Sequence, residues 1–155
     1  NDLNMIVDNS HLNEKGFWDI AKYSHHPLVA THSNVHTICP HTRNLTNRQL
    51  DAIKDTRGMV GVNFAPAFLR QDGKMLADTD IQLIIDHFKY LIDHLGEDHV
   101  GFGSDFDGAM MPKELNSVTE MPKIIELMQN QGFDHSLLNK ICHQNWINLI
   151  KKILI

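Results

Sequence analysis

The chain has 155 residues and a mass of 17.7 kDa, enough for one domain that buries roughly 70% of its unfolded surface. Its hydrophobic content of 42% and charged content of 21% exclude collagen-like, low-complexity and coiled-coil classes. The net charge of −5 argues against a nucleic-acid-binding surface, and no run of about 18 apolar residues is present to span a membrane. We therefore predict a single domain over residues 1–155, with no nucleic acid and no membrane as partner.

Apolar segments of strand length alternate along the sequence with amphipathic segments of helix length. We predict strands over residues 5–9, 28–31, 59–64 and 99–103. We predict helices over residues 14–23, 47–55, 81–95 and 120–130 and from 136 to the end, the first two capped by Asn13 and Thr46. The helix over 81–95 has the clearest apolar spacing, and residues 65–78 form the longest irregular stretch.

Four strand–helix units in succession predict an α/β fold. Parallel strands need a long crossover, which is usually a helix, so this repeat indicates a parallel sheet covered by helices. Binding and catalytic sites of such sheets are built at the carboxyl ends of the strands. Polar residues that directly follow a predicted strand are therefore the candidates for chemistry.

Two of the eleven histidines, His11 and His32, follow consecutive predicted strands. In a barrel they would face the same mouth and lie close enough to share one metal ion. A catalytic zinc usually has three protein ligands and a water, so two imidazoles make an incomplete site. Each histidine taken singly also fits a structural, hydrogen-bonded role. His36 and His41 rank below His32, because neither lies at a strand end.

Asp105 follows the fourth predicted strand in a glycine-containing segment, whereas Asp107 can instead serve the turn. Arg43 lies in a polar loop, where its guanidinium would either bind a carboxylate through two parallel hydrogen bonds or form a surface ion pair. Cys39 and Cys142 are too few for a disulfide framework and are interpreted as buried thiols of a reducing compartment.

The chain contains, in order, Asp-Asn-Ser-His11, Thr-His32-Ser-Asn, Pro-His-Thr-Arg43-Asn-Leu-Thr, Val-Asn63-Phe and Gly-Phe-Gly-Ser-Asp105-Phe-Asp-Gly. This order resembles the membrane (renal) dipeptidase family of zinc peptidases. The spacing of 21 between His11 and His32, and of 11 between His32 and Arg43, also agrees with the family pattern. The similarity extends from about Leu3 to the last predicted helix.

The resemblance implies a (β/α)₈ barrel in which two zinc ions share a bridging carboxylate and a water, and in which dipeptides are hydrolysed. His11 and His32 match the two histidines that hold one zinc. Arg43 matches the arginine that binds the carboxylate of the substrate. Asp105 matches the aspartate at the substrate end of the site, which handles the amino group or a proton. The implied cofactor is zinc and the implied substrate is a dipeptide.

The family's first His-x-Asp pair, its bridging Glu and a further substrate-binding His precede the matched region and have no counterpart in this chain. We therefore expect the C-terminal half of a metal-dependent-hydrolase (β/α)₈ TIM barrel, inactive alone, whose open face pairs with the missing N-terminal half or with a second copy as a homo-oligomer. The sparse cysteines and the lack of an anchor tail lead us to expect a cytoplasmic location.

Two alternatives stay open. The first is another amidohydrolase-like metal hydrolase, acting for instance on a lactam or an acylated amino acid. The second is a catalytically inactive dipeptidase-like fragment or binding module. A substrate without a carboxylate leaves Arg43 with no evident role, and a site without a bridging carboxylate should hold zinc weakly.

Overall fold

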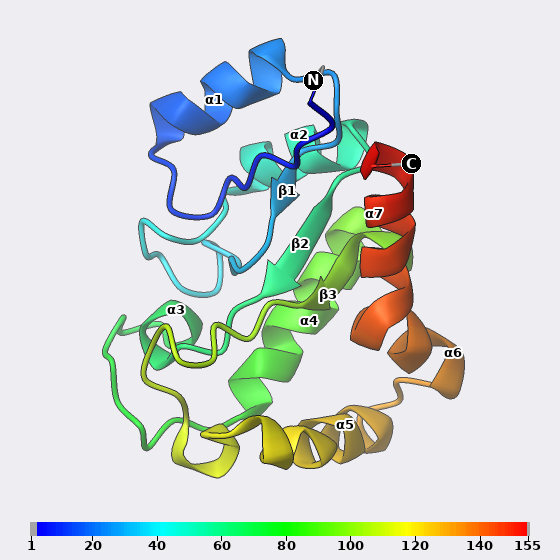
Figure 1. The fold of residues 1–155 in the computed structure, drawn as a ribbon. Helices are drawn as coiled ribbons and strands as arrows, with labels where there is room; N and C mark the ends of the chain where they lie inside the picture. The colour runs from blue at the N-terminus through cyan, green and yellow to red at the C-terminus, as the bar shows by residue number, and fades with distance from the viewer. Residues whose placement is uncertain (1–2, 155) are drawn as a thin grey trace.

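The computed structural model describes residues 3–154 and has a three-stranded parallel sheet among helices (Figure 1). The strands are β1 (Val29–Ala30), β2 (Met59–Val62) and β3 (Val100–Phe102), in the order β1-β2-β3. Val29 pairs with Met59, and Val60 pairs with Val100. Neighbours in the sheet are thus consecutive in the chain and joined by helical crossovers, which confirms the predicted α/β class.

The helices agree closely with the periodic segments of the sequence. Their bounds are α1 (Glu14–Tyr23), α2 (Asn47–Asp55), α3 (Pro66–Leu69), α4 (Gln82–Leu95), α5 (Met121–Asn130), α6 (His135–Asn139) and α7 (Asn145–Leu154). Both predicted caps are confirmed: the Asn13 side chain accepts the Gly16 N–H, and Thr46 forms a capping box with Gln49. Short 3₁₀ turns cover Glu97–His99, Lys113–Leu115 and Val118–Glu120.

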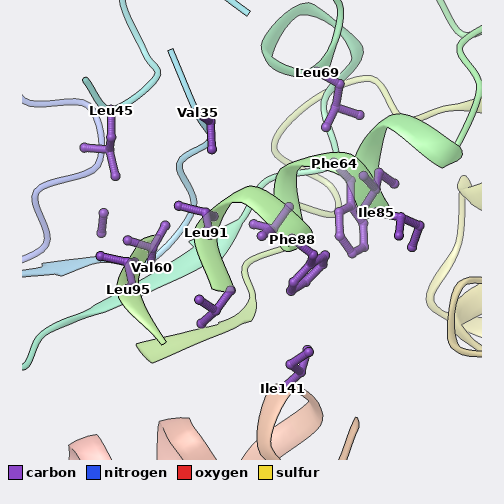
Figure 2. Packing of buried hydrophobic residues seen from close by; sticks show 14 of the residues in the cluster. Val35, Leu45, Val60, Phe64, Leu69, Ile85, Phe88, Leu91, Leu95 and Ile141 are labelled. Atoms are coloured by element: carbon purple, nitrogen blue, oxygen red, sulfur yellow. The ribbon is translucent and has the colours of Figure 1, made fainter. Parts of the chain in front are cut away.

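The main hydrophobic core lies between the sheet and α4. Figure 2 shows Val60 of β2 beside Leu91 and Leu95 of α4, with Phe88 of the same helix toward Phe64. All five side chains are buried, and burying one Leu or Phe contributes about 1.5–3 kcal/mol. The helical spacing over 81–95 therefore reflects the face of α4 that covers the sheet.

The opposite face of the sheet is covered in part by α7. Val29 and Met59 pack there with Leu149 and Ile153 of α7 in a second, smaller cluster. Trp146 of the same helix donates its indole N–H to the carbonyl of Phe102, at 3.0 Å. The last helix is therefore tied to β3 by a hydrogen bond and to β1 and β2 by apolar contact.

Three sequence expectations need correction. Residues 5–9 do not form a strand, because within this segment only Asp8 makes a parallel bridge, to Val29. Among residues 3–154, three of the four predicted strands are therefore present, and a single bridge stands in place of the first. Leu3, Met5 and Val7 are exposed, so this segment lacks the packing that would extend the pairing. The expected irregular stretch 65–78 contains α3, and the last predicted helix is divided between α6 and α7 by a π-helical turn over Lys140–Gln144.

Both cysteines are free thiols; Cys39 is buried and Cys142 is half-buried. Burial raises the pKa of each thiol. Within residues 3–154, no helix is long and apolar enough to cross a membrane.

Candidate active site

The segment after the Asp8 bridge and the loop after β1 are joined by a hydrogen-bond network. One carboxylate oxygen of Asp8 accepts the backbone N–H groups of Ser10 (3.0 Å) and Thr31 (2.9 Å). The Ser10 hydroxyl oxygen accepts the backbone N–H of His32, at 3.0 Å. These bonds bring His11, the residue after Ser10, next to His32 although 21 positions separate them in the sequence.

The two imidazole rings lie with their centroids 4.9 Å apart and their planes tilted by 55°. His11 has a left-handed backbone conformation (φ 68°), which is uncommon for a residue with a side chain. Two imidazoles at this separation suit one metal ion, for which histidine is a common ligand. Among residues 3–154, however, no group of three or more His, Cys, Asp or Glu side chains is placed to hold a metal.

A hydroxyl group and nearby charges surround the imidazole ring of His32. Its Nδ1 lies 2.7 Å from the hydroxyl oxygen of Thr31. Burial lowers the pKa of His32 below its ordinary value, although the charges of Asp105 and Asp8 act in the opposite direction. The ring is therefore neutral near pH 7, and a neutral imidazole is the form that binds metals.

Asp105 also has a left-handed backbone, with φ 63°, and its carboxylate is held by Asn63, the residue after β2. The side-chain N–H of Asn63 donates to Asp105 Oδ2 at 2.9 Å, while Asn63 Oδ1 accepts the Ala65 N–H at 2.7 Å. Asn34 binds the backbone of Asn63 at both its N–H and its carbonyl. The orientation of the Asn63 amide is thus determined, and it presents a donor to Asp105.

Arg43 carries a guanidinium that the described residues leave partly unpaired. Its Nε and Nη2 are buried without a hydrogen-bond partner, and the group lies 5.3 Å from the ring centre of Phe68. The loop is fixed by the Arg43 backbone N–H, which donates to His41 Nδ1. Burial lowers the pKa of Arg43, against the opposing charges of Asp105 and Asp8, but an arginine stays protonated. Such a cation is suited to an anionic ligand with two oxygens.

The strand ends approach one another unusually closely beneath these side chains. A Cβ at Gly61 or at Gly103 would lie 2.0 Å from the carbonyl oxygen of Thr31. Only glycine leaves room for this contact. The two glycines therefore allow the backbone of Thr31, just before His32, to lie against the ends of β2 and β3.

His11, His32, Arg43 and Asp105 are brought into one region. Strand-end position had made His11, His32 and Asp105 candidates, whereas Arg43 was expected in a polar loop and was linked to the site by the family resemblance. Sequence reasoning did not single out Asp8, Asn34 or Phe68. Asp8 carried a usable signal, because it is an acidic residue at the end of an apolar segment. Asn34 is the last residue of the motif Thr-His32-Ser-Asn but was given no role there. Phe68 carried no signal, since its contacts come from distant parts of the chain.

The structure also places three neighbouring candidates. His41 binds the Arg43 backbone and packs against Phe68, and the backbone N–H of His36 donates to the Leu45 carbonyl. Asp107 has φ 64° in the exposed turn after Asp105, which agrees with the turn role considered for it.

A parallel sheet with paired imidazoles, a carboxylate and a partly unpaired guanidinium beyond its strands is an α/β arrangement consistent with a metal hydrolase. More narrowly, the chain belongs to the membrane dipeptidase family, peptidase family M19, whose sequence profile matches residues 1–154. The family resemblance seen in the sequence is therefore confirmed, and with it the assignment to a family of metallopeptidases.

Relatives by sequence span far more than this chain. An uncharacterized protein in the pqqA 5′ region of Klebsiella pneumoniae is 50% identical over 153 residues, which cover 99% of this chain and 56% of that protein. The dipeptidase tcpJ of Claviceps purpurea is 31% identical over 156 residues, covering 99% of this chain and 36% of that protein.

Two solved structures share the fold. A metallopeptidase from Rhodobacter sphaeroides, liganded with a phosphinate mimic of the dipeptide L-Ala-D-Ala, has a TM-score of 0.96 at 51% identity over 98% of this chain and 43% of that one. The dipeptidase AC, a metallopeptidase of family M19, has a TM-score of 0.97 at 52% identity over 99% of this chain and 44% of that one. The chain thus spans about half the length of these relatives, or less.

Proposed function

We propose that this chain is the C-terminal half of a (β/α)₈ barrel that hydrolyses the amide bond of dipeptides with two zinc ions. Support comes from relatives named as dipeptidases, from a solved relative liganded with a dipeptide mimic, and from a matched length near half of theirs. The three parallel strands with helical crossovers are consistent with part of such a barrel. We propose that activity requires the N-terminal half.

The observation that carries the proposal is the Arg43 guanidinium with two buried, unpaired nitrogens. An unpaired buried donor is costly, so a ligand that pairs with it gains affinity. A dipeptide ends in a carboxylate, whose two oxygens match the fork of a guanidinium. Arg43 would thereby orient the substrate. It would also select dipeptides, because it binds a free C-terminal carboxylate that lies one residue from the scissile bond.

Asp105 would bind the other end of the substrate. Asn63 donates to one carboxylate oxygen of Asp105, which leaves the remaining lone pairs for an amino group or a transferred proton. Arg43 lies near enough to Asp105 for the aspartate charge to act on its pKa. A carboxylate and a guanidinium on one site complement the two opposite charges of a dipeptide zwitterion.

His11 and His32 would hold one zinc ion, in line with the 4.9 Å between their ring centres and the neutral state of His32. Bound zinc would polarise the amide carbonyl and lower the pKa of a water toward 7. We propose that the missing ligands, a His-x-Asp pair and a bridging Glu, come from the N-terminal half. This follows from the family resemblance and from the absence of a third ligand group within residues 3–154.

The test combines this chain with a matched N-terminal half and zinc, and measures hydrolysis of L-Ala-D-Ala and of the same dipeptide with an amidated C-terminus. We expect activity only in the mixture, with a strong preference for the free carboxylate. Arg43→Lys should lower kcat/KM for the free dipeptide on the order of 10- to 100-fold and leave the amide almost unaffected, because lysine keeps the charge but lacks the fork.

Arg48→Lys is the matched control, because Arg48 is exposed on α2 over the Trp18 ring, and the stacking lost there should change kcat/KM for neither substrate. If the folded mixture cleaves both substrates equally, or Arg43→Lys affects them alike, another amidohydrolase-type substrate is favoured. A folded, zinc-loaded mixture that cleaves neither would favour the inactive binding module.

A further inference from the structure

Thr31 lies between the carboxylate of Asp8 and the ring of His32. Its hydroxyl donates to Asp8 Oδ2, and its oxygen lies 2.7 Å from His32 Nδ1. The direct distance from His32 Nδ1 to Asp8 Oδ2 is 3.9 Å, which is too long for a hydrogen bond. Besides acting through its charge, Asp8 is therefore linked to the ring by hydrogen bonds only through the Thr31 hydroxyl.

The hydrogens available on Asp8, Thr31 and His32 determine which of these groups donates to which. Asp8 accepts two backbone N–H groups at Oδ1 and the hydroxyl hydrogen at Oδ2, as a carboxylate that only accepts should. Thr31 has one hydroxyl hydrogen, and that hydrogen points to Asp8. The oxygen lone pair is then what faces His32, so Nδ1 must carry the hydrogen and Nε2 is left with a free lone pair.

We propose that Asp8 and Thr31 are positioning residues that hold His32 in the Nδ1–H tautomer and thereby leave Nε2 as its metal-binding nitrogen. Metal-binding histidines generally donate their other ring N–H to a partner of this kind, which sets the tautomer and orients the ring. Gly61 and Gly103 help to fix the backbone of Thr31, because both lie against its carbonyl oxygen. The inference rests on the proposed metal role of His32, although the tautomer itself is a property of the metal-free chain.

The tautomer can be read directly from two-bond ¹H–¹⁵N correlation spectra of the full chain labelled at histidine nitrogens, with His32→Gln identifying the His32 signals. We expect a single Nδ1–H form. Asp8→Asn should invert it. The two backbone N–H groups keep the amide oxygen at the Oδ1 position, so the amide NH₂ faces Thr31 and turns the hydroxyl hydrogen toward Nδ1. A wild-type Nε2–H form, or an Asp8→Asn variant with an unchanged tautomer, would overturn the proposal.

Two variants of Thr31 separate the effect of its hydroxyl group from the effect of its side-chain size. Thr31→Val should lose the single tautomer and weaken zinc binding, measured by chelator competition in the mixture with the N-terminal half, by about 10- to 100-fold. Thr31→Ser restores the hydroxyl and should restore both readouts. Thr37→Val, which removes a hydroxyl from the neighbouring loop, should change neither. Equal zinc affinity in Thr31→Val and wild type would contradict a positioning role.

The two proposals can fail independently. An Nδ1–H form of His32 with no dipeptide cleavage would leave this inference standing and remove the proposed substrate. Dipeptide cleavage by a protein whose His32 is Nε2–H would keep the proposed function and remove the role of Asp8 and Thr31.

Discussion

His87 illustrates how a single buried histidine serves the architecture and not the chemistry. It is fully buried on α4, where Nδ1 accepts the Val35 N–H at 3.1 Å and Nε2 lies 3.2 Å from the Leu69 carbonyl oxygen. The backbone donor at Nδ1 requires the hydrogen to be on Nε2. His87 thus joins α4 to the loop that carries Arg43 and to the end of α3, and it needs to be neutral to do so.

The pKa of His87 makes stability depend on pH. Burial lowers this pKa to about 4, against roughly 6.5 for an unfolded histidine. Between these values the unfolded chain binds a proton that the folded chain does not, so the contribution is complete above pH 6.5 and is lost as pH falls toward 4. From pH 7.5 to 5.0, wild type should lose about 2 kcal/mol more unfolding free energy than His87→Gln, measured by urea denaturation.

His135→Gln is the control for this prediction, because His135 is exposed at the start of α6 and should keep the wild-type pH dependence. Equal pH slopes for wild type and His87→Gln would show that His87 is not the group responsible.

At the scale of elements, the site depends on how closely β2 and β3 approach the end of β1. Gly61 and Gly103 are not turn residues; each is small because the Thr31 carbonyl occupies the space of a side chain. The same strand ends carry Asn63 and Asp105, which hydrogen-bond to each other across the edge of the sheet. The close packing of the strand ends therefore also determines where the site residues lie.

Gly61→Ala should consequently be strongly destabilising. Its Cβ would lie 2.0 Å from a backbone oxygen, which cannot rotate away as a side chain can, so a shift of the strands is needed. We expect a loss of about 1–3 kcal/mol or more in urea denaturation. Gly16→Ala is the comparison, because Gly16 lies in α1 with its nearest contact at 3.3 Å from a side chain. A near-neutral Gly61→Ala would refute the close approach.

At the scale of the whole molecule, the apolar surface is uneven. Among residues 3–154, seven of the twelve large exposed hydrophobic side chains lie in the segment before α1 or on α7, namely Leu3, Met5, Val7, Leu12, Ile147, Ile150 and Leu154. The other five are spread over the rest of the chain. Exposed apolar patches generally mark interaction surfaces. The segment before α1 is also an edge, since its one bridge is to β1. These features favour a chain that completes its packing with another polypeptide.

We therefore expect the chain alone to self-associate, giving a mass above 17.7 kDa by size-exclusion chromatography with light scattering. Addition of the matched N-terminal half should convert it to a one-to-one complex, because that half is the proposed occupant of the open barrel edge. Met5→Glu, placed in the exposed segment, should weaken self-association, whereas Glu126→Gln on α5 should not. A monomeric chain that unfolds cooperatively would contradict this expectation.

Much of the secondary structure could be predicted from local patterns. The caps at Asn13 and Thr46 and the apolar face of α4 depend on residues close together in sequence, and each was confirmed. The strand expected over 5–9 was wrong because strand formation depends on a neighbour, and only Asp8 finds one, in β1. The π-helical turn before α7 had no sequence signal.

The sequence by itself determined the α/β class, the family and the four candidate residues, because helix periodicity, strand-end position and motif order are all properties of the linear chain. Only the tertiary structure decided how those residues are supported. Asp8 meets Thr31, the residue before His32, and Asn63 meets Asp105, because parallel strands bring separated segments to one edge. Hydrogen-bond partners across such distances depend on packing, which no local pattern encodes.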